Sequence, residues 1–182
     1  MKDKAYLFVY SFTNFINGII AHTAGPLIPF LAASSHIPPT NFYFLFISRS
    51  TGAIVGAILY KILQHFNLAA NHHRILGLTS VLLLLTLVLF QFWHTTVGMG
   101  ILIGIYSSLC FAYGTALNCS VLIVPSKEDI FFWLSISNGI FGVGCLLGPL
   151  FVDLFQLRVY TFYAVLVLPI SVLYLFILKS PQ

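Results

Sequence analysis

Long apolar stretches separated by short polar breaks dominate this chain. Six of the stretches are long enough to cross a bilayer, whose hydrocarbon core takes about 20 mostly apolar residues per helix. They cover residues 5–33, 41–64, 75–93, 97–124, 129–155 and 159–178. The breaks between them leave no room for a soluble domain. The pattern therefore predicts an all-α integral membrane protein whose residues 1–182 form one domain of six transmembrane helices.

Composition agrees with this prediction and excludes several classes of function. The chain is 59% hydrophobic and 7% charged, whereas soluble domains are about 25% charged. Its basic residues are scattered, which argues against nucleic-acid binding. The three cysteines lie in apolar stretches without the spacing of a metal or disulfide site. No catalytic constellation stands out, so we expect no enzymatic activity, no metal and no cofactor.

The distribution of basic residues predicts how the chain lies in the membrane. Six spans place both termini on one side, and most of the lysines and arginines fall on that side. These are Lys2, Lys4, Lys61, Arg74, Lys127 and Lys179, with Arg158 at the opposite face. By the positive-inside rule, the termini face the cytosol or, in a mitochondrial inner membrane, the matrix.

The spans differ in character, and the difference repeats after three. The third and sixth spans carry few polar groups and no glycine pairs, which is typical of helices that face lipid. The other four carry asparagine, serine, threonine and most of the glycines, which let helices approach closely or hydrogen-bond inside a protein. The order predicts an inverted repeat of three plus three helices.

Short motifs extend this pattern to a family resemblance. "GPLIPFLA" closes the first span, a small-residue run joins Gly52 to Gly56 in the second, and "GVGCLLGP" lies in the fifth, where Gly144, Gly148 and Pro149 form a glycine–proline motif. Over its whole length the chain resembles half of a major facilitator superfamily transporter. The resemblance implies a six-helix half bundle in which spans one and four line a cavity, two and five meet the other half, and three and six lie outermost.

The chain also departs from that family. The loop after the family's second helix carries an acid and an arginine that latch the inward gate, whereas "YKILQHFNLAANHHR" has Gln64 and His65 near those positions. No acidic residue lies between Asp3 and Glu128, so this latch cannot form. Alternating access is a rocking of two halves around a shared site, and this chain supplies one half.

These departures favour an accessory subunit of a larger membrane complex that is derived from a transporter half and catalyses no reaction. A respiratory or other energy-converting membrane, such as the mitochondrial inner membrane, is the candidate host. The alternative is a half-sized transporter of a small polar or anionic solute that works as a dimer. The expected partners are membrane lipids and either other membrane subunits or a second copy of the chain.

Asparagines on the inner spans are candidate ligands for a solute. Asn14 and Asn17 share one face of the first span, and Asn118 and Asn138 lie in the fourth and fifth. Each side chain either hydrogen-bonds a polar substrate or joins neighbouring helices, an interaction worth about 0.6 kcal/mol in membrane proteins.

Arg49 is the most informative polar residue in the sequence. It lies eight residues into the second span, about 12 Å along a helix. An arginine at the centre of a transmembrane helix costs at least about 2.5–3.5 kcal/mol, so it needs an acceptor. The acid within a span is Asp153. We therefore expect an ion pair between Arg49 and Asp153 or a bond to a helix-end carbonyl, with an anionic substrate, a lipid headgroup or a neighbouring subunit as alternatives.

Overall fold

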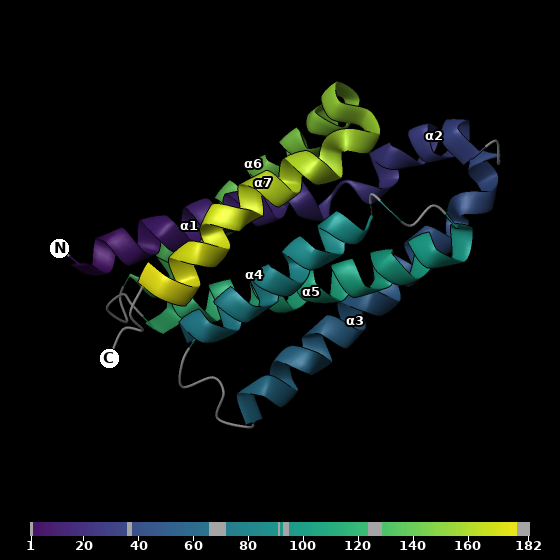
Figure 1. Cartoon of the computed structure of the whole chain (residues 1–182). Helices are drawn as coiled ribbons and strands as arrows, with labels where there is room; N and C mark the ends of the chain where they lie inside the picture. The colour runs from purple at the N-terminus through teal and green to yellow at the C-terminus, as the bar shows by residue number, and fades with distance from the viewer. Residues whose placement is uncertain are drawn as a thin grey trace.

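A computed structural model describes residues 2–35, 38–65, 72–90, 92, 95–123 and 129–177, and every regular element in these ranges is a helix (Figure 1). The elements are α1 (Lys2–Ala21), α2 (Ala24–Ser35), η1 (Pro39–Phe42), α3 (Tyr43–His65), α4 (His72–Leu89), α5 (Thr96–Ile123), α6 (Ile130–Phe155), η3 (Gln156–Arg158), α7 (Val159–Val172) and the π-helical η4 (Leu173–Ile177). The boundaries of α3, α4, α5, α6 and α7 with η4 lie within a few residues of the predicted spans.

The first predicted span, 5–33, is not one continuous helix. It breaks after Ala21 and resumes at Ala24, and the two segments are bent by 41°. Pro26 explains the break, because a proline has no backbone N–H and its ring collides with the carbonyl four residues earlier, here that of His22. The helix can restart only with Pro26 in its first turn, where prolines are tolerated.

Three described stretches are long and apolar enough to cross a membrane, namely Pro39–His65, Val97–Ile123 and Ile130–Phe176, and α1 with α2 makes a fourth if a broken span is counted. The last stretch reverses direction at η3, where Gln156 has a φ of 50°, and α7 runs back beside α6 (Figure 1). The helix His73–Leu89 is shorter. These features agree with an all-α membrane protein.

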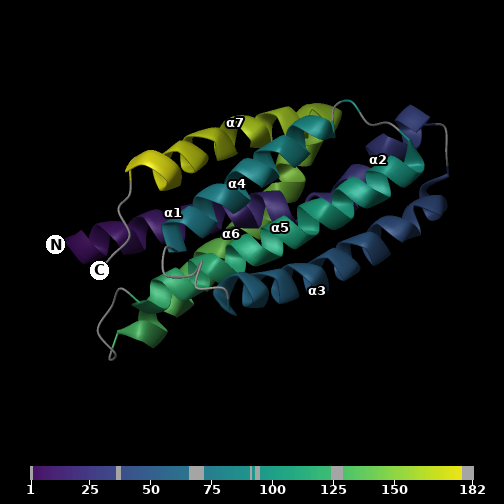
Figure 2. The same cartoon turned by 60° about the horizontal axis from the view of Figure 1, so that its bottom comes forward.

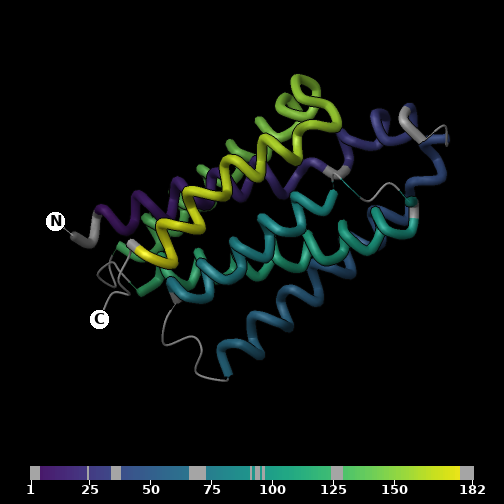
Figure 3. The backbone as a smooth tube through the Cα atoms, in the orientation of Figure 1, coloured from purple at the N-terminus to yellow at the C-terminus, as the bar shows by residue number. Residues whose placement is uncertain are grey.

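Two helix pairs dominate the packing of the bundle. The most extensive contacts join α3 to α5 and α1 to α6, and α4 packs between α5 and α7. Figure 2 shows α7, α4, α5 and α3 one after another across the molecule. The tube in Figure 3 shows that α1 begins and η4 ends at the same end of the bundle. Because α1 also contacts α5, the two pairs meet along one seam.

Glycines let the helices of the α3–α5 pair approach closely. A Cβ atom added at Gly52 would overlap the carbonyl oxygen of Gly104, and one added at Gly56 would overlap that of Ser108. Backbone atoms cannot rotate away as a side chain can. The contact therefore requires glycine at both positions.

The α1–α6 pair uses the same device with the roles of the helices exchanged. A Cβ atom at Gly144 would overlap the carbonyl oxygen of Phe15, and one at Gly148 would lie 2.6 Å from that of Ile19. Pro149 follows within α6 and is half-buried. The structure thus places all four glycines of the predicted packing set at helix–helix contacts.

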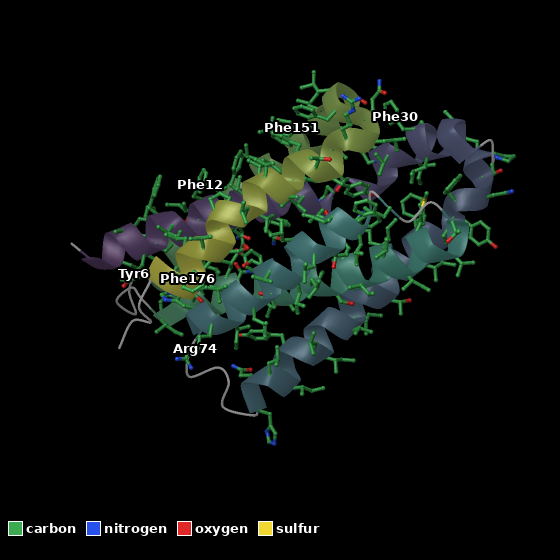
Figure 4. All side chains as sticks on the ribbon, viewed as in Figure 1. Tyr6, Phe12, Phe30, Arg74, Phe151 and Phe176 are labelled. Carbon is green, nitrogen blue, oxygen red and sulfur yellow. The ribbon has the colours of Figure 1, made fainter. Side chains whose placement is uncertain are left out.

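The outer surface of the bundle is apolar. On α4, Leu78, Leu82 and Leu85 are 42–54% exposed, while the hydroxyls of Thr79 and Thr86 bond to carbonyls of their own helix. Phe12 and Phe176 are also exposed, at 51% and 80% (Figure 4). A soluble protein rarely exposes so much contiguous apolar surface, whereas lipid tails accept it without cost.

The glycine contacts predict unequal effects for neighbouring alanine substitutions in α6. Gly144→Ala forces the α1 and α6 backbones apart, and overpacking of this kind costs about 1–3 kcal/mol. Gly142→Ala is the matched control, since a Cβ at Gly142 meets nothing within 4 Å. Thermal unfolding in detergent should show a lower midpoint for Gly144→Ala alone. Equal midpoints for the two variants would contradict the packing described for this pair.

Candidate functional site

A cavity of about 360 Å³ opens between the two helix pairs. Its lining comes from four helices and from His22, which lies in the break after α1. The lining residues on the helices are Asn14, Asn17 and Ala21 on α1; Arg49 and Ala53 on α3; Tyr106, Ser107, Cys110, Phe111, Gly114, Thr115 and Asn118 on α5; and Asn138 and Phe141 on α6. Neither α4 nor α7 contributes to this lining. The volume lies in the range of small-molecule binding sites.

Arg49 lines this cavity and does not form the predicted ion pair. Asp153 is exposed near the end of α6 and does not line the cavity. Within the described residues, the Arg49 guanidinium has neither an ion pair nor a hydrogen bond. It shares the cavity lining with His22 and Cys110. The pair fails because the rotation of α6 turns Asp153 outward, which a count of acids cannot reveal.

The four candidate asparagines all line the cavity, but their bonding differs. Asn14 Nδ2 donates to the carbonyl oxygen of Ser137 at 3.2 Å and to its Oγ at 3.1 Å, so this amide joins α1 to α6. The Oδ1 atoms of Asn17 and Asn118 are buried and accept no hydrogen bond within the described part of the chain. Asn138 is exposed at the edge of the cavity.

The hydroxyl groups on α5 are used in two ways. Thr115 Oγ1 donates to the carbonyl of Phe111 at 2.8 Å and Ser108 Oγ donates to that of Gly104 at 2.9 Å, so their donors are satisfied within the helix. Thr95 Oγ1, just before α5, accepts from the Gly98 N–H at 3.2 Å and caps the start of the helix. The hydroxyl protons of Thr115 and Ser108 are therefore not available to a ligand.

The break in the first span lies beside the cavity and is capped from α5. The Ile20 carbonyl, freed by the break, accepts hydrogen bonds from Thr23 Oγ1 at 2.5 Å and from the Tyr106 hydroxyl. Interrupted helices occur at membrane depth only where their freed backbone groups find partners inside the protein or line a cavity. Tyr106 meets both conditions, because it supplies a partner and lines the cavity.

A second polar cluster was not expected from the sequence. His73 is 2% exposed, and its Nε2 lies 2.5 Å from the Tyr10 hydroxyl. The Tyr174 hydroxyl donates to Thr13 Oγ1 at 3.1 Å, and the Tyr10 and Tyr174 rings stack 6.4 Å apart. In the sequence, "NHHR" looked like part of a polar break, but the structure begins α4 at His72 and buries the next residue. This cluster joins α1, α4 and η4 away from the cavity.

No group of three or more histidine, cysteine or acidic side chains gathers into a metal site among the described residues. The polar groups of the cavity are one guanidinium, amides, hydroxyls, a thiol and an imidazole. None of the described lining residues carries a carboxylate. The site therefore suits a negatively charged, hydrogen-bonding occupant rather than a cation.

The cap at the helix break predicts different costs for two tyrosines of α5. Tyr106→Phe removes the bond to Ile20 and should cost about 1 kcal/mol of unfolding free energy, the usual net contribution of a hydrogen bond. The Tyr113 hydroxyl is buried without a hydrogen-bond partner within the described ranges, so Tyr113→Phe should be neutral or slightly stabilising. Denaturant unfolding in mixed micelles measures both. A Tyr113→Phe loss equal to that of Tyr106→Phe would refute the assignment.

Comparisons with known proteins add no assignment to this geometry. No family model, no curated protein and no solved structure matches the chain. What the protein does must therefore be inferred from its cavity, its charge and its hydrogen-bonding groups.

Proposed function

We propose that this protein is a membrane-embedded subunit of a carrier that binds a small organic anion in the cavity between its two helix pairs. The observation that carries this proposal is the position of Arg49, a permanent positive charge that lines the cavity without a countercharge in the described chain. A charge in an apolar bundle is costly unless water or an anion meets it. An anionic solute supplies the missing partner.

The arrangement of helices supports the resemblance to a transporter half. In a three-plus-three repeat, exchanging the two three-helix repeats maps the second span onto the fifth and the fourth span onto the first. The α3–α5 pair then corresponds to the α6–α1 pair, and these are the two most extensive contacts. The glycine pairs exchange in the same way, since Gly52 and Gly56 pack on α5 while Gly144 and Gly148 pack on α1.

The match between the two three-helix repeats is incomplete. The α4–α5 contact is broad, whereas the corresponding α7–α1 contact is small. The repeat therefore supports a shared plan rather than strict symmetry. All six predicted spans, the termini on the cytosolic or matrix side and a mitochondrial host remain parts of this proposal.

The cavity requires a second body to complete it. It opens between α3 and α6, and both helices expose large apolar side chains such as Ile54 and Leu146. A polar opening on an apolar surface is covered by protein in a membrane, because lipid cannot solvate its guanidinium and amides. We propose a second copy of the chain as that cover, which gives a carrier of two halves.

An accessory subunit of a larger membrane complex is the second candidate. It is favoured by the lack of any carboxylate among the lining residues that would couple transport to protons, and by exposed Gln64 and His65 at the end of α3 where the family's latch would begin. In that case partner subunits take the place of the second copy.

The proposal predicts that anion uptake depends on Arg49. The purified full chain, reconstituted into phosphatidylethanolamine–phosphatidylglycerol vesicles, should raise the uptake of radiolabelled gluconate or inorganic phosphate above that of empty vesicles. Arg49→Gln should return uptake to background because the anion loses its countercharge. Arg158→Gln is the matched control, since Arg158 is exposed in η3 and does not line the cavity. Uptake by Arg49→Gln at the normal rate would exclude this role for Arg49.

The two candidate functions predict different masses. After extraction from its native membrane in mild detergent, a carrier of two halves should run as twice 20.2 kDa after correction for bound detergent. Native mass spectrometry checks this directly. Co-purification at fixed stoichiometry with other membrane proteins would instead support the accessory subunit, and a lone monomer would contradict both candidates.

A further inference from the structure

The cavity is elongated and follows α5. Its lining residues on this helix run from Tyr106 to Asn118, a rise of about 18 Å. At the first end, the Tyr106 hydroxyl caps the helix break beside the cavity. Because α1 runs antiparallel to α5, with Asn17 against Gly114, Asn14 lies toward the Asn118 end. The cavity therefore has two distinct ends, one at the helix break and one among the asparagines.

The glycine contacts of the α3–α5 pair fix the level of Arg49 in this cavity. Gly52 lies against Gly104 of α5 and Gly56 lies against Ser108, so the two helices run in the same direction. Arg49 precedes Gly52 by almost one turn, which puts it level with the start of the α5 lining. Its side chain leans further that way, because helical side chains tilt toward the N-terminus of their helix. The positive charge thus lies at the end nearest the helix break.

The stretch of cavity that follows Arg49 is apolar. Ala53 lies one turn further along α3, Phe111 and Gly114 lie between the two ends of the α5 lining, and α6 adds Phe141. The Phe111 side chain is 53% exposed, so its ring offers apolar surface to an occupant. Most of the surface that the cavity exposes is apolar. This stretch favours a hydrocarbon body rather than a hydroxylated one.

Much of the polar lining is turned away from an occupant. The Oδ1 atoms of Asn17 and Asn118 are buried within the described chain, and the Asn17 Nδ2 lies against the α5 backbone. The Asn14 amide and the Tyr106 and Thr115 hydroxyls donate to other protein groups. An occupant therefore meets a charge at one end and few hydrogen-bonding groups along the apolar stretch.

We propose that the occupant is an amphiphilic anion with one anionic group and a single apolar chain, such as a medium-chain carboxylate. Its carboxylate accepts hydrogen bonds from the Arg49 guanidinium, and its chain lies along Ala53 and Phe111. This inference rests on the proposed function and names the solute class that the same site takes. Gluconate and phosphate satisfy the charge but place hydrophilic groups against apolar walls, so they are the weaker ligands of this site.

The test measures binding of radiolabelled octanoate to the full chain by equilibrium dialysis. The chain is held in phosphatidylcholine nanodiscs, and empty nanodiscs correct for partition into lipid. Unlabelled butanoate, gluconate and 1-octanol compete, so that each lacks either the long apolar chain or the charge. We expect octanoate to bind at least tenfold more tightly than any of them, because each buried methylene group strengthens binding by up to about fourfold.

Variants connect this preference to named side chains. Arg49→Gln should weaken octanoate binding at least tenfold because the carboxylate loses its countercharge. Phe111→Ala should weaken octanoate binding at least threefold and butanoate binding less than twofold, since only the longer chain reaches the ring. Retained butanoate binding shows that this variant is folded. Phe132→Ala is the matched control, because Phe132 is 60% exposed on α6 outside the cavity lining.

A second arm distinguishes a free carboxylate from a membrane lipid that carries the same chemistry. Octanoate binding is repeated in nanodiscs that contain phosphatidylglycerol. We expect the same affinity, because a narrow cavity of about 360 Å³ suits one free chain. Weaker octanoate binding in these discs, with phosphatidylglycerol as the competitor, would overturn the free carboxylate as the occupant.

The remaining outcomes separate this inference from the proposed function. If labelled gluconate binds as tightly as octanoate and both are lost in Arg49→Gln, the amphiphilic class is overturned while the anion site remains. An octanoate preference that is unchanged in Phe111→Ala would also overturn the class. If the wild-type chain binds neither labelled octanoate nor labelled gluconate, both the inference and the proposed function fail.

Discussion

The close approach of helix backbones at paired glycines is the constraint on which the rest of this structure depends. Gly52 and Gly56 bring α3 against α5, and Gly144 and Gly148 bring α6 against α1. In lipid there is no hydrophobic drive to hold helices together, so van der Waals contact and hydrogen bonds must do so. Because each pair is held so tightly, the space that remains lies between the pairs and becomes the cavity.

Arg49 gives that space its chemical character. The surrounding amides, hydroxyls and thiol are neutral, and Asp153, the acid expected to pair with Arg49, is exposed outside the cavity lining. An uncompensated guanidinium within low-dielectric walls produces a strong local potential that concentrates anions.

Much of the helical pattern could be predicted from the sequence, because runs of apolar residues and a glycine spacing of four are local features. The break in the first span was missed even though Pro26 marks it, since apolar character continues on both sides of His22. The burial of His73 could not be predicted, because its partners Tyr10 and Tyr174 come from distant parts of the chain.

The sequence predicted which polar residues belong to the candidate site, but not which hydrogen bonds and ion pairs they form. Arg49 and the four asparagines all line one cavity, as polar residues on inner spans should. Sequence spacing places Asn14 and Asn17 on one face, yet the rotation of α6 decides that Ser137 binds Asn14 alone. The same rotation removes Asp153 from Arg49. Contacts between helices depend on axial rotations that no periodicity encodes.

The central claim is that Arg49 presents its charge to a solute-accessible cavity. The most direct test is thiol modification of Ala53→Cys, one turn from Arg49 in the cavity lining, in a chain whose three native cysteines are replaced by alanine. The account predicts that an anionic methanethiosulfonate reacts faster than a cationic one, relative to a free thiol in solution. This preference should vanish with Arg49→Gln, and Ile54→Cys on the outer face should react slowly with both reagents. A charge preference at Ala53→Cys that persists in the Arg49→Gln variant would contradict the account. Equal reaction rates at Ala53→Cys and Ile54→Cys would contradict it as well.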